Sequence, residues 1–197
     1  MRKRLGAAPN RTHADGSPFY TLPIIQDAST GEIVGDSFEI ALYLDRTYAA
    51  GPRLIPAGSV GLHAAFNVQV DAVFTGSVIL CVQGMPFNPE TAAQSQATFL
   101  QRAGRTSWEE MGVTGPAREE VLKGFNAALE ELAKAYRFSG GPFLEGDVPS
   151  YADLIVGGWL QFYKTTLDSK EWADLQSWQG GLWGRVHRAL EKYADVK

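Results

Sequence analysis

The residues best suited to chemistry are Asp36 and Ser37, an acidic–hydroxyl pair at the start of a predicted helix, and the Leu22-Pro23 step in the apolar run before them. Aspartate and serine at a helix start usually accept hydrogen bonds from its first N–H groups. The same end of a helix attracts anions, because its dipole and free N–H groups point outward. The sequence therefore predicts an anion site where Pro23 faces the start of this helix.

Two short strands must position this helix. Residues 21–27 are apolar and β-branched, residues 28–31 have turn-type side chains, and residues 32–34 form a second short apolar run. This order predicts a β-hairpin. The helix follows from position 36, because its apolar residues recur at three- and four-residue steps. Pro23 cannot donate a ladder hydrogen bond, so it predicts a kink in the first strand.

The order of these features resembles the second half of the thioredoxin-like domain of glutathione transferases. The resemblance rests on Tyr20-Thr21-Leu22-Pro23, Asp36-Ser37 and Tyr43-Leu44-Asp45, and it is strongest to fungal members related to the bacterial lignin β-etherases. It implies that Pro23 is cis, that Leu22 offers backbone groups to the cysteinyl part of glutathione, and that Asp36 and Ser37 hold the γ-glutamyl end. Each residue alone more often serves as a turn proline, a helix cap or an apolar strand residue, so the order and spacing carry the resemblance.

The resemblance implies an α+β fold that is mostly α. A truncated thioredoxin-like domain, a hairpin plus a helix, is predicted over residues 1–50, a Gly/Pro-rich linker over 51–58 and an all-helical domain over 59–197. Within the last, helices are expected over 59–85 and 91–110, from 114 to the Gly140-Gly141-Pro142 stop, and from Ser150. Residues 1–18 are expected to form the end of a helix and a loop.

In the resembled family a strand, a helix and a second strand come before the hairpin, and the loop after the first strand carries the group that activates the glutathione thiol. The sequence shows no counterpart of that segment, so the catalytic residue is unknown and Ser17 is not assigned to the role. A hairpin alone is marginally stable, and an uncovered strand edge pairs readily with another chain. The hairpin is therefore expected to pack against the C-terminal helices, to be partly disordered, or to pair with a second copy in a homodimer.

The resemblance also places an apolar co-substrate pocket on the first C-terminal helices. Candidate wall residues are Phe66, Val70, Phe74 and Phe99. Partners for the glycyl end of glutathione, chosen by charge and position, are Lys3, Arg4, Arg11 and His13. The five tryptophans could line an apolar pocket or act as packing anchors, and packing is the commoner role.

Ser150 and Asp153 have the spacing of a capping box, in which a hydroxyl and an acid three residues later bond reciprocally to backbone N–H groups. The stretch Gly146-Asp147-Val148-Pro149-Ser150 also matches the resembled family. The predicted role of both residues is structural, with no chemistry assigned.

Composition excludes several functions. The 197 residues carry 18 basic and 22 acidic side chains, a net charge of −4 without long runs of one sign, which argues against nucleic-acid binding. The longest apolar stretch contains Asp71, which argues against a membrane span. With no secretory signal and one cysteine, Cys81, in an apolar run, the expected location is cytoplasmic and the thiol is expected to be buried and inert. The scattered histidines predict no metal site.

Two functions follow. The first is a glutathione S-transferase-like enzyme that conjugates glutathione to hydrophobic electrophiles, or cleaves aryl ethers with it, with little turnover expected because the thiol-activating loop is not seen. The second is a non-catalytic ligand-binding or protein-interaction module derived from that family. Both functions predict glutathione as the principal small-molecule partner. The enzyme function also predicts a hydrophobic electrophile as a second partner.

Overall fold

The computed structural model describes residues 2–12 and 15–194. It divides into two compact units, Met1–Ala64 and Ala65–Lys197. The predicted linker at 51–58 lies just before the helix that crosses this division, so the first turn of that helix belongs to the N-terminal unit. Each unit is described by itself below.

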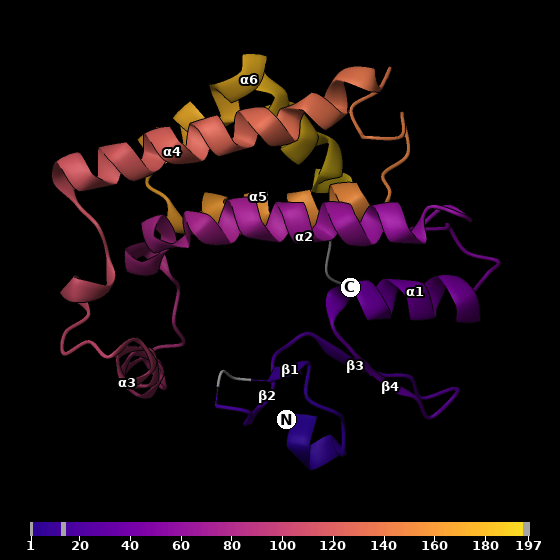
Figure 1. The fold of residues 1–197 in the computed structure, drawn as a ribbon, viewed down its shortest axis with the longest axis horizontal. Coiled ribbons are helices and arrows are strands. Elements are labelled where there is room, and N and C mark those ends of the chain that lie inside the picture. Colours follow the sequence, from indigo (N-terminus) through magenta and orange to yellow (C-terminus); the bar gives the residue numbers. More distant parts are fainter. Residues whose placement is uncertain (1, 13–14, 195–197) are drawn as a thin grey trace. The chain divides into compact units, whose positions relative to one another are not determined.

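The N-terminal unit holds one helix and two small sheets (Figure 1). Its elements are the 3₁₀ turn η1 (Arg2–Leu5), the strands β1 (Arg11–Thr12), β2 (Pro18–Phe19), β3 (Ile24–Gln26) and β4 (Ile33–Gly35), and the helix α1 (Ser37–Thr47). The β1–β2 pair was not predicted, since two-residue strands leave no alternation in the sequence. The expected hairpin at 21–34 is confirmed as the antiparallel pair β3–β4, with Ile24 opposite Gly35.

Local chemistry explains how the hairpin and α1 are held. Gly31 closes the turn with a positive φ of 79°, and its N–H donates to the Asp27 carbonyl at 2.8 Å. On α1, the Asp45 carboxylate accepts from the backbone N–H groups of Leu54 (2.8 Å) and Ile55 (2.7 Å). The predicted linker is therefore tied back to α1, which explains why it belongs to the N-terminal unit.

The C-terminal unit is all-helical. In chain order its elements are α2 (Val60–Gly76), η2 (Val78–Gly84), α3 (Ala92–Ala103), η3 (Glu109–Met111), α4 (Gly115–Ala133), η4 (Lys134–Phe138), α5 (Tyr151–Thr166), α6 (Ser169–Leu190) and η5 (Glu191–Tyr193). The mostly helical fold class predicted from the sequence is confirmed. The single helix expected over 59–85 is instead α2 and η2, bent by 57° relative to each other.

One apolar core runs through the bundle formed by α2, α4, α5 and α6 (Figure 1). Phe74 of α2 stacks on Trp159 of α5, with ring centroids 5.6 Å apart and 7° between the planes. Its ring meets Phe125 of α4 and Tyr163 of α5 edge-on. Such aromatic pairs stabilise a core beyond their buried area, so this cluster joins three helices.

The paths of η2 and α6 are set by glycines. A Cβ on Gly84 would lie 1.9 Å from the Thr166 carbonyl oxygen, so only glycine allows η2 to approach the end of α5 this closely. In α6, the residues from Trp178 to Gly181 leave helical geometry, and Gln179, Gly180 and Gly181 have positive φ. Gly180 and Gly181 therefore lie at a kink inside α6.

No single helix in the described residues is long and apolar enough to cross a membrane. Only the bent pair of α2 and η2 meets the length and composition required. Its residues Val70, Phe74 and Leu80 are buried in the core.

Candidate functional site at the start of α1

Asp36 is the N-cap of α1. Its backbone has φ 85° and ψ 133°, and its carboxylate accepts a hydrogen bond from the Phe38 N–H at 3.0 Å. Ser37 follows as the first helical residue and is exposed. The acidic–hydroxyl pair therefore lies at the positive end of the helix dipole, as its types and order predict.

The Leu22-Pro23 peptide bond is cis. The Asp36 N–H donates to the Pro23 carbonyl at 3.2 Å, so the proline step and the helix start are in direct contact. Leu22 is 69% exposed, and Pro23 is exposed beside it. The four residues assigned to glutathione binding thus gather on one accessible part of the N-terminal unit; the geometry fits their roles, and the roles themselves stay predictions.

A hydrogen-bond network that sequence reasoning missed joins the hairpin turn to α1. Oδ1 of Asp27 accepts from the N–H (2.8 Å) and hydroxyl (2.6 Å) of Ser29. Its Oδ2 accepts from the hydroxyls of Tyr43 (2.7 Å) and Tyr48 (2.5 Å). The Ser29 and Tyr hydroxyl donors hold the pKa of Asp27 far below its ordinary value. The available signal was an Asp-x-Ser turn followed by two tyrosines, one within α1 and one directly after its end.

This network predicts a pH effect. Because the folded-state pKa of Asp27 is depressed, its contribution to stability is fully present above the ordinary pKa of 3.8 and is lost as the pH falls toward the folded-state value. We expect Asp27→Asn to be less stable than the parent at pH 7 and the difference to shrink below about pH 4. Thermal melts from pH 7 to pH 2.5 measure this.

Asp15→Asn is the matched control, because Asp15 also accepts from the N–H (2.9 Å) and hydroxyl (2.6 Å) of the serine two residues on, Ser17. Because the two tyrosine hydroxyls donate to Asp27, Asp15→Asn should lose less stability at pH 7 than Asp27→Asn does. A constant difference between parent and Asp27→Asn down to pH 2.5 would contradict the account.

The predicted wall of the co-substrate pocket requires correction. Val70 and Phe74 are 0% exposed and belong to the core, so they offer no surface to a ligand. The family resemblance placed them on the early helices of a ligand cleft, but an apolar side chain on such a helix packs as readily on neighbouring helices as on a ligand. Phe66 is half-buried, and Phe99 of α3 is 40% exposed; a ligand role for these two stays a prediction.

Phe99 belongs to a small aromatic cluster outside the main core. Its ring centroid lies 6.1 Å from Phe87 and 6.2 Å from Trp108, and Phe87 lies 5.3 Å from Trp108. The other four tryptophans pack at the main core: Trp183 is fully buried, and Trp159, Trp172 and Trp178 lie against it. Packing is therefore their principal role.

The Ser150–Asp153 capping box forms as predicted at the start of α5. The Asp153 carboxylate accepts from the Ser150 N–H (3.0 Å) and also from the Leu144 N–H (2.9 Å), and the residue is 0% exposed. Its position among backbone donors fits a structural role.

The remaining candidates are less informative. Lys3 and Arg4 are exposed on η1, and the Lys3 ammonium lies 4.9 Å from the centre of the Tyr20 ring. His13 and the side chain of Arg11 lie outside the described residues. Cys81 is 0% exposed, and burial raises the pKa of its thiol, which fits the expected inert cysteine.

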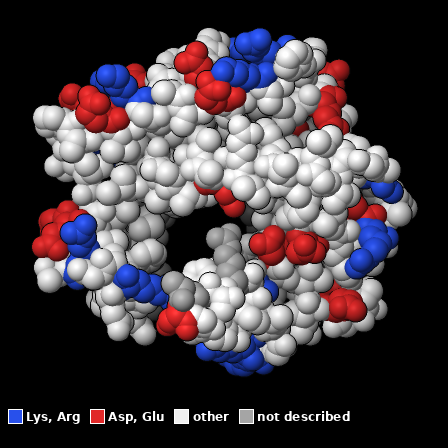
Figure 2. Space-filling model, in the orientation of Figure 1, with Lys and Arg blue, Asp and Glu red and all other residues white. Residues whose placement is uncertain are grey.

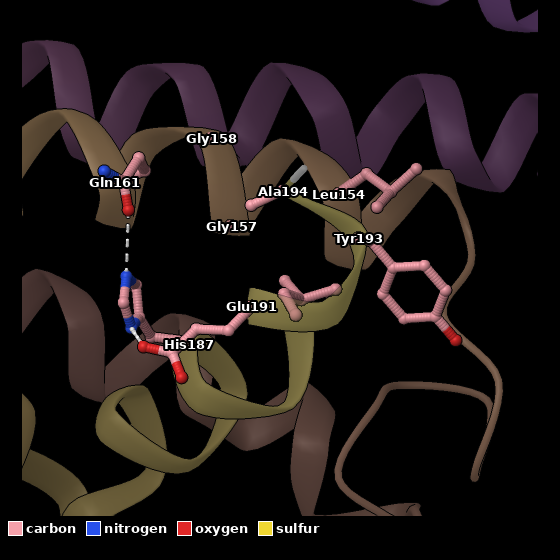
Figure 3. Close-up of a pocket in the computed structure, with 9 residues that line it drawn as sticks. Leu154, Gly157, Gly158, Gln161, His187, Glu191, Tyr193 and Ala194 are labelled. Atoms are coloured by element: carbon pink, nitrogen blue, oxygen red, sulfur yellow. Dashed lines mark hydrogen bonds and ion pairs between the residues drawn. The ribbon is translucent and has the colours of Figure 1, made fainter. Parts of the chain in front are cut away.

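An open pocket of about 230 Å³, which was not predicted from the sequence, lies between α5 and the end of α6 (Figure 3). His187 lies on its wall and is in hydrogen-bond contact with Gln161 (Nε2 to Oε1, 3.1 Å). Burial and the positive charge of Lys164 lower the pKa of His187. Gly157 and Gly158 of α5 line the pocket with no side chain of their own. The wall is mostly apolar, and two of its polar groups, Gln161 and His187, are hydrogen-bonded to each other, so no ligand role is assigned to this pocket.

The distribution of surface charge does not indicate a further binding site. On the face seen in Figure 2, basic and acidic side chains are interspersed and form no continuous basic patch. Among the described residues, no group of three or more His, Cys, Asp or Glu side chains could hold a metal ion.

A cis-proline strand bonded to an acid-capped helix start, followed by an all-helical unit, defines a thioredoxin-like module joined to a helical domain. A family model described as "Glutathione S-transferase, C-terminal domain" matches residues 61–193. This chain belongs to the glutathione S-transferase family.

Individual relatives agree. The glutathione S-transferase-like protein ustS of Aspergillus flavus is 26% identical over 205 residues, which cover 94% of this chain and 73% of that protein. A glutathione S-transferase of Ceriporiopsis subvermispora, solved in complex with glutathione, is 33% identical with a TM-score of 0.87, over 100% of this chain and 80% of its own. A second from that organism, also with glutathione, is 30% identical with a TM-score of 0.82, over 97% and 79%.

Proposed function

We propose that this chain binds glutathione on its N-terminal unit, with the γ-glutamyl end at the start of α1. The observation that carries the proposal is the 3.2 Å hydrogen bond from the Asp36 N–H to the carbonyl of the cis residue Pro23, which unites the two predicted half-sites. The two glutathione complexes among its relatives support it.

Each group has a physical task in this proposal. The α-carboxylate of the γ-glutamyl group meets the first N–H groups of α1 and the Ser37 hydroxyl, where the helix dipole favours negative charge. The Asp36 carboxylate attracts the ligand's ammonium group. The backbone of Leu22, at the exposed cis step, pairs with the cysteinyl part in strand fashion.

Calorimetric titration of glutathione into the parent chain and Ser37→Ala tests this proposal. We expect saturable binding that weakens about tenfold in the variant, the equivalent of about 1.4 kcal/mol. Ser169→Ala is the matched control, because Ser169 is also an exposed first helical residue behind a capping aspartate, Asp168. It should bind like the parent. Equal affinity of Ser37→Ala and the parent would remove Ser37 from the site.

The chemistry that such binding serves is transfer of the glutathione thiolate to a hydrophobic electrophile, including an aryl ether. The thiol gives its proton to solvent or a base, the sulfur forms a bond to an electrophilic carbon, and the leaving group departs with the electron pair of the broken bond. Phe66 and Phe99 are the candidates on the C-terminal unit for contact with the apolar co-substrate.

A ligand-binding module without turnover is the second candidate. The positions of Cys81 and Ser17 favour it: the thiol is fully buried, and the Ser17 hydroxyl already donates to Asp15 at 2.6 Å. An assay with a chloronitrobenzene separates the two. Glutathione binding with background turnover supports the module; conjugation well above background, dependent on the chain, supports the transferase and rejects the module.

Pairing with a second copy is a further part of the proposal. Among the described residues β3 has one strand partner, β4, which leaves its other edge open for pairing. Sedimentation at micromolar concentration should give the mass of two chains, and the mass of one chain would reject this interface.

A cytoplasmic location is likewise proposed from composition alone, and fractionation of expressing cells tests it.

A further inference from the structure

Arg2 is a buried cation in the N-terminal unit. It lies on η1 and is 7% exposed. Its Nη1 donates to the Thr21 carbonyl at 3.2 Å, and its Nη2 donates to the Ala8 carbonyl at 3.0 Å. The guanidinium thus holds the residue directly before the cis Leu22-Pro23 step.

The described residues compensate the burial of this guanidinium only in part. None of the ion pairs found between described residues includes Arg2, and its Nε is buried without a hydrogen-bond partner. A buried charge without a counter-charge destabilises a fold, and an unpaired buried N–H adds to the cost. Among the described residues, the partners of the guanidinium are therefore the backbone carbonyls of Thr21 and Ala8.

Gly35 makes room for the guanidinium. A Cβ at position 35 would lie 2.2 Å from Nη1 of Arg2 and 2.5 Å from its Cζ. The guanidinium therefore occupies the space that a side chain at position 35 would need, directly before Asp36-Ser37. Any larger residue at position 35 must displace Arg2.

We infer that Arg2 is a positioning residue for the glutathione site, an inference that rests on the proposed function. Through Thr21 it fixes the backbone that leads into Leu22, and through Gly35 it fixes the backbone that leads into Asp36 and Ser37. One planar group thereby sets the spacing between the cysteinyl and γ-glutamyl half-sites. Arginine suits this task because its donors form a rigid fork, whereas lysine offers a single mobile ammonium.

A double-mutant cycle on Arg2 and Gly35, read by glutathione calorimetry, tests the inference. We expect Arg2→Ala and Gly35→Ala each to weaken glutathione binding about tenfold, since either change removes the guanidinium from its place. With Arg2 absent, a Cβ at position 35 meets no guanidinium, so the double variant should bind no more weakly than Arg2→Ala alone. Such non-additivity marks a shared interaction.

Two further variants separate positioning from stability. Arg2→Lys keeps the charge without the fork, so its glutathione affinity should fall like that of Arg2→Ala. Arg53→Ala, an exposed arginine elsewhere in the N-terminal unit, is the matched control and should bind like the parent. All titrations are run at a temperature at which circular dichroism shows each variant folded.

The outcomes are distinct. If the parent binds glutathione and the Arg2 and Gly35 variants bind equally well, the role of Arg2 is wrong and the proposed function stands. If the two single effects simply add, Arg2 and Gly35 act separately and the inference is wrong. If the parent does not bind glutathione, the proposed function fails and the inference fails with it.

Discussion

Phe74→Ala is expected to lower the free energy of unfolding of the C-terminal unit by about 3–5 kcal/mol, the usual cost of removing a large buried aromatic side chain. Phe74 is 0% exposed and contacts aromatic rings from two other helices, Trp159, Tyr163 and Phe125. The cavity left by its ring would be lined on several sides by rigid side chains that collapse poorly. Urea unfolding followed by tryptophan fluorescence measures the loss.

Phe99→Ala is the matched control. Phe99 is 40% exposed and lies in the small cluster with Phe87 and Trp108, so its removal should cost about 1 kcal/mol or less. If Phe74→Ala left stability unchanged and instead altered the binding of a hydrophobic ligand, Phe74 would be a pocket residue and the corrected assignment would be wrong.

Glu171→Ala is expected to destabilise the C-terminal unit by about 3 kcal/mol, because it leaves Arg118 partly buried without its counter-charge. Glu171 of α6 receives two hydrogen bonds from Arg118 of α4, from Nε (2.5 Å) and Nη2 (2.6 Å). The Arg118 side chain is 20% exposed and the Glu171 side chain is 10% exposed. Arg118 also donates to the carbonyls of Leu80 (3.0 Å) and Val113 (3.3 Å), so this ion pair joins four segments.

Asp174→Ala is the control on the same helix. Asp174 pairs with Lys170 at 2.8 Å, but those side chains are 52% and 86% exposed, and exposed pairs contribute about 0–1 kcal/mol. Replacing both Arg118 and Glu171 with methionine should cost less than Glu171→Ala, since no unpaired charge is then buried. A Glu171→Ala variant as stable as Asp174→Ala would show that solvent already screens the pair.

Local signals in the sequence were enough to predict the hairpin and the cap at Asp36, whereas the cis form of Pro23 was predicted from the family resemblance. The turn residues, the capping pair and the proline act within a few positions of one another, and the family resemblance supplied their shared purpose. Ser150 and Asp153 were predictable for the same reason, because a capping box spans only one helical turn.

Contacts between distant segments were not predictable. The Arg118–Glu171 pair spans 53 positions, and the Tyr43 bond to Asp27 spans 16; neither leaves a periodic trace. The family resemblance placed Val70 and Phe74 on the early helices of a ligand cleft but did not show which side chains of those helices pack into the core, which is why core residues were assigned to a pocket wall. The role of Gly35 beside Arg2 depends on a tertiary approach that no local pattern encodes.

The central claim is that glutathione binds at the start of α1 and the cis Leu22-Pro23 step. The most direct test is a glutathione titration of the ¹⁵N-labelled chain, followed through the amide signals in NMR spectra. The account predicts saturable shifts centred on the amides of Leu22, Asp36 and Ser37, with the core of the C-terminal unit unaffected. Saturable shifts confined to the C-terminal unit, or no shifts at millimolar glutathione, would contradict it.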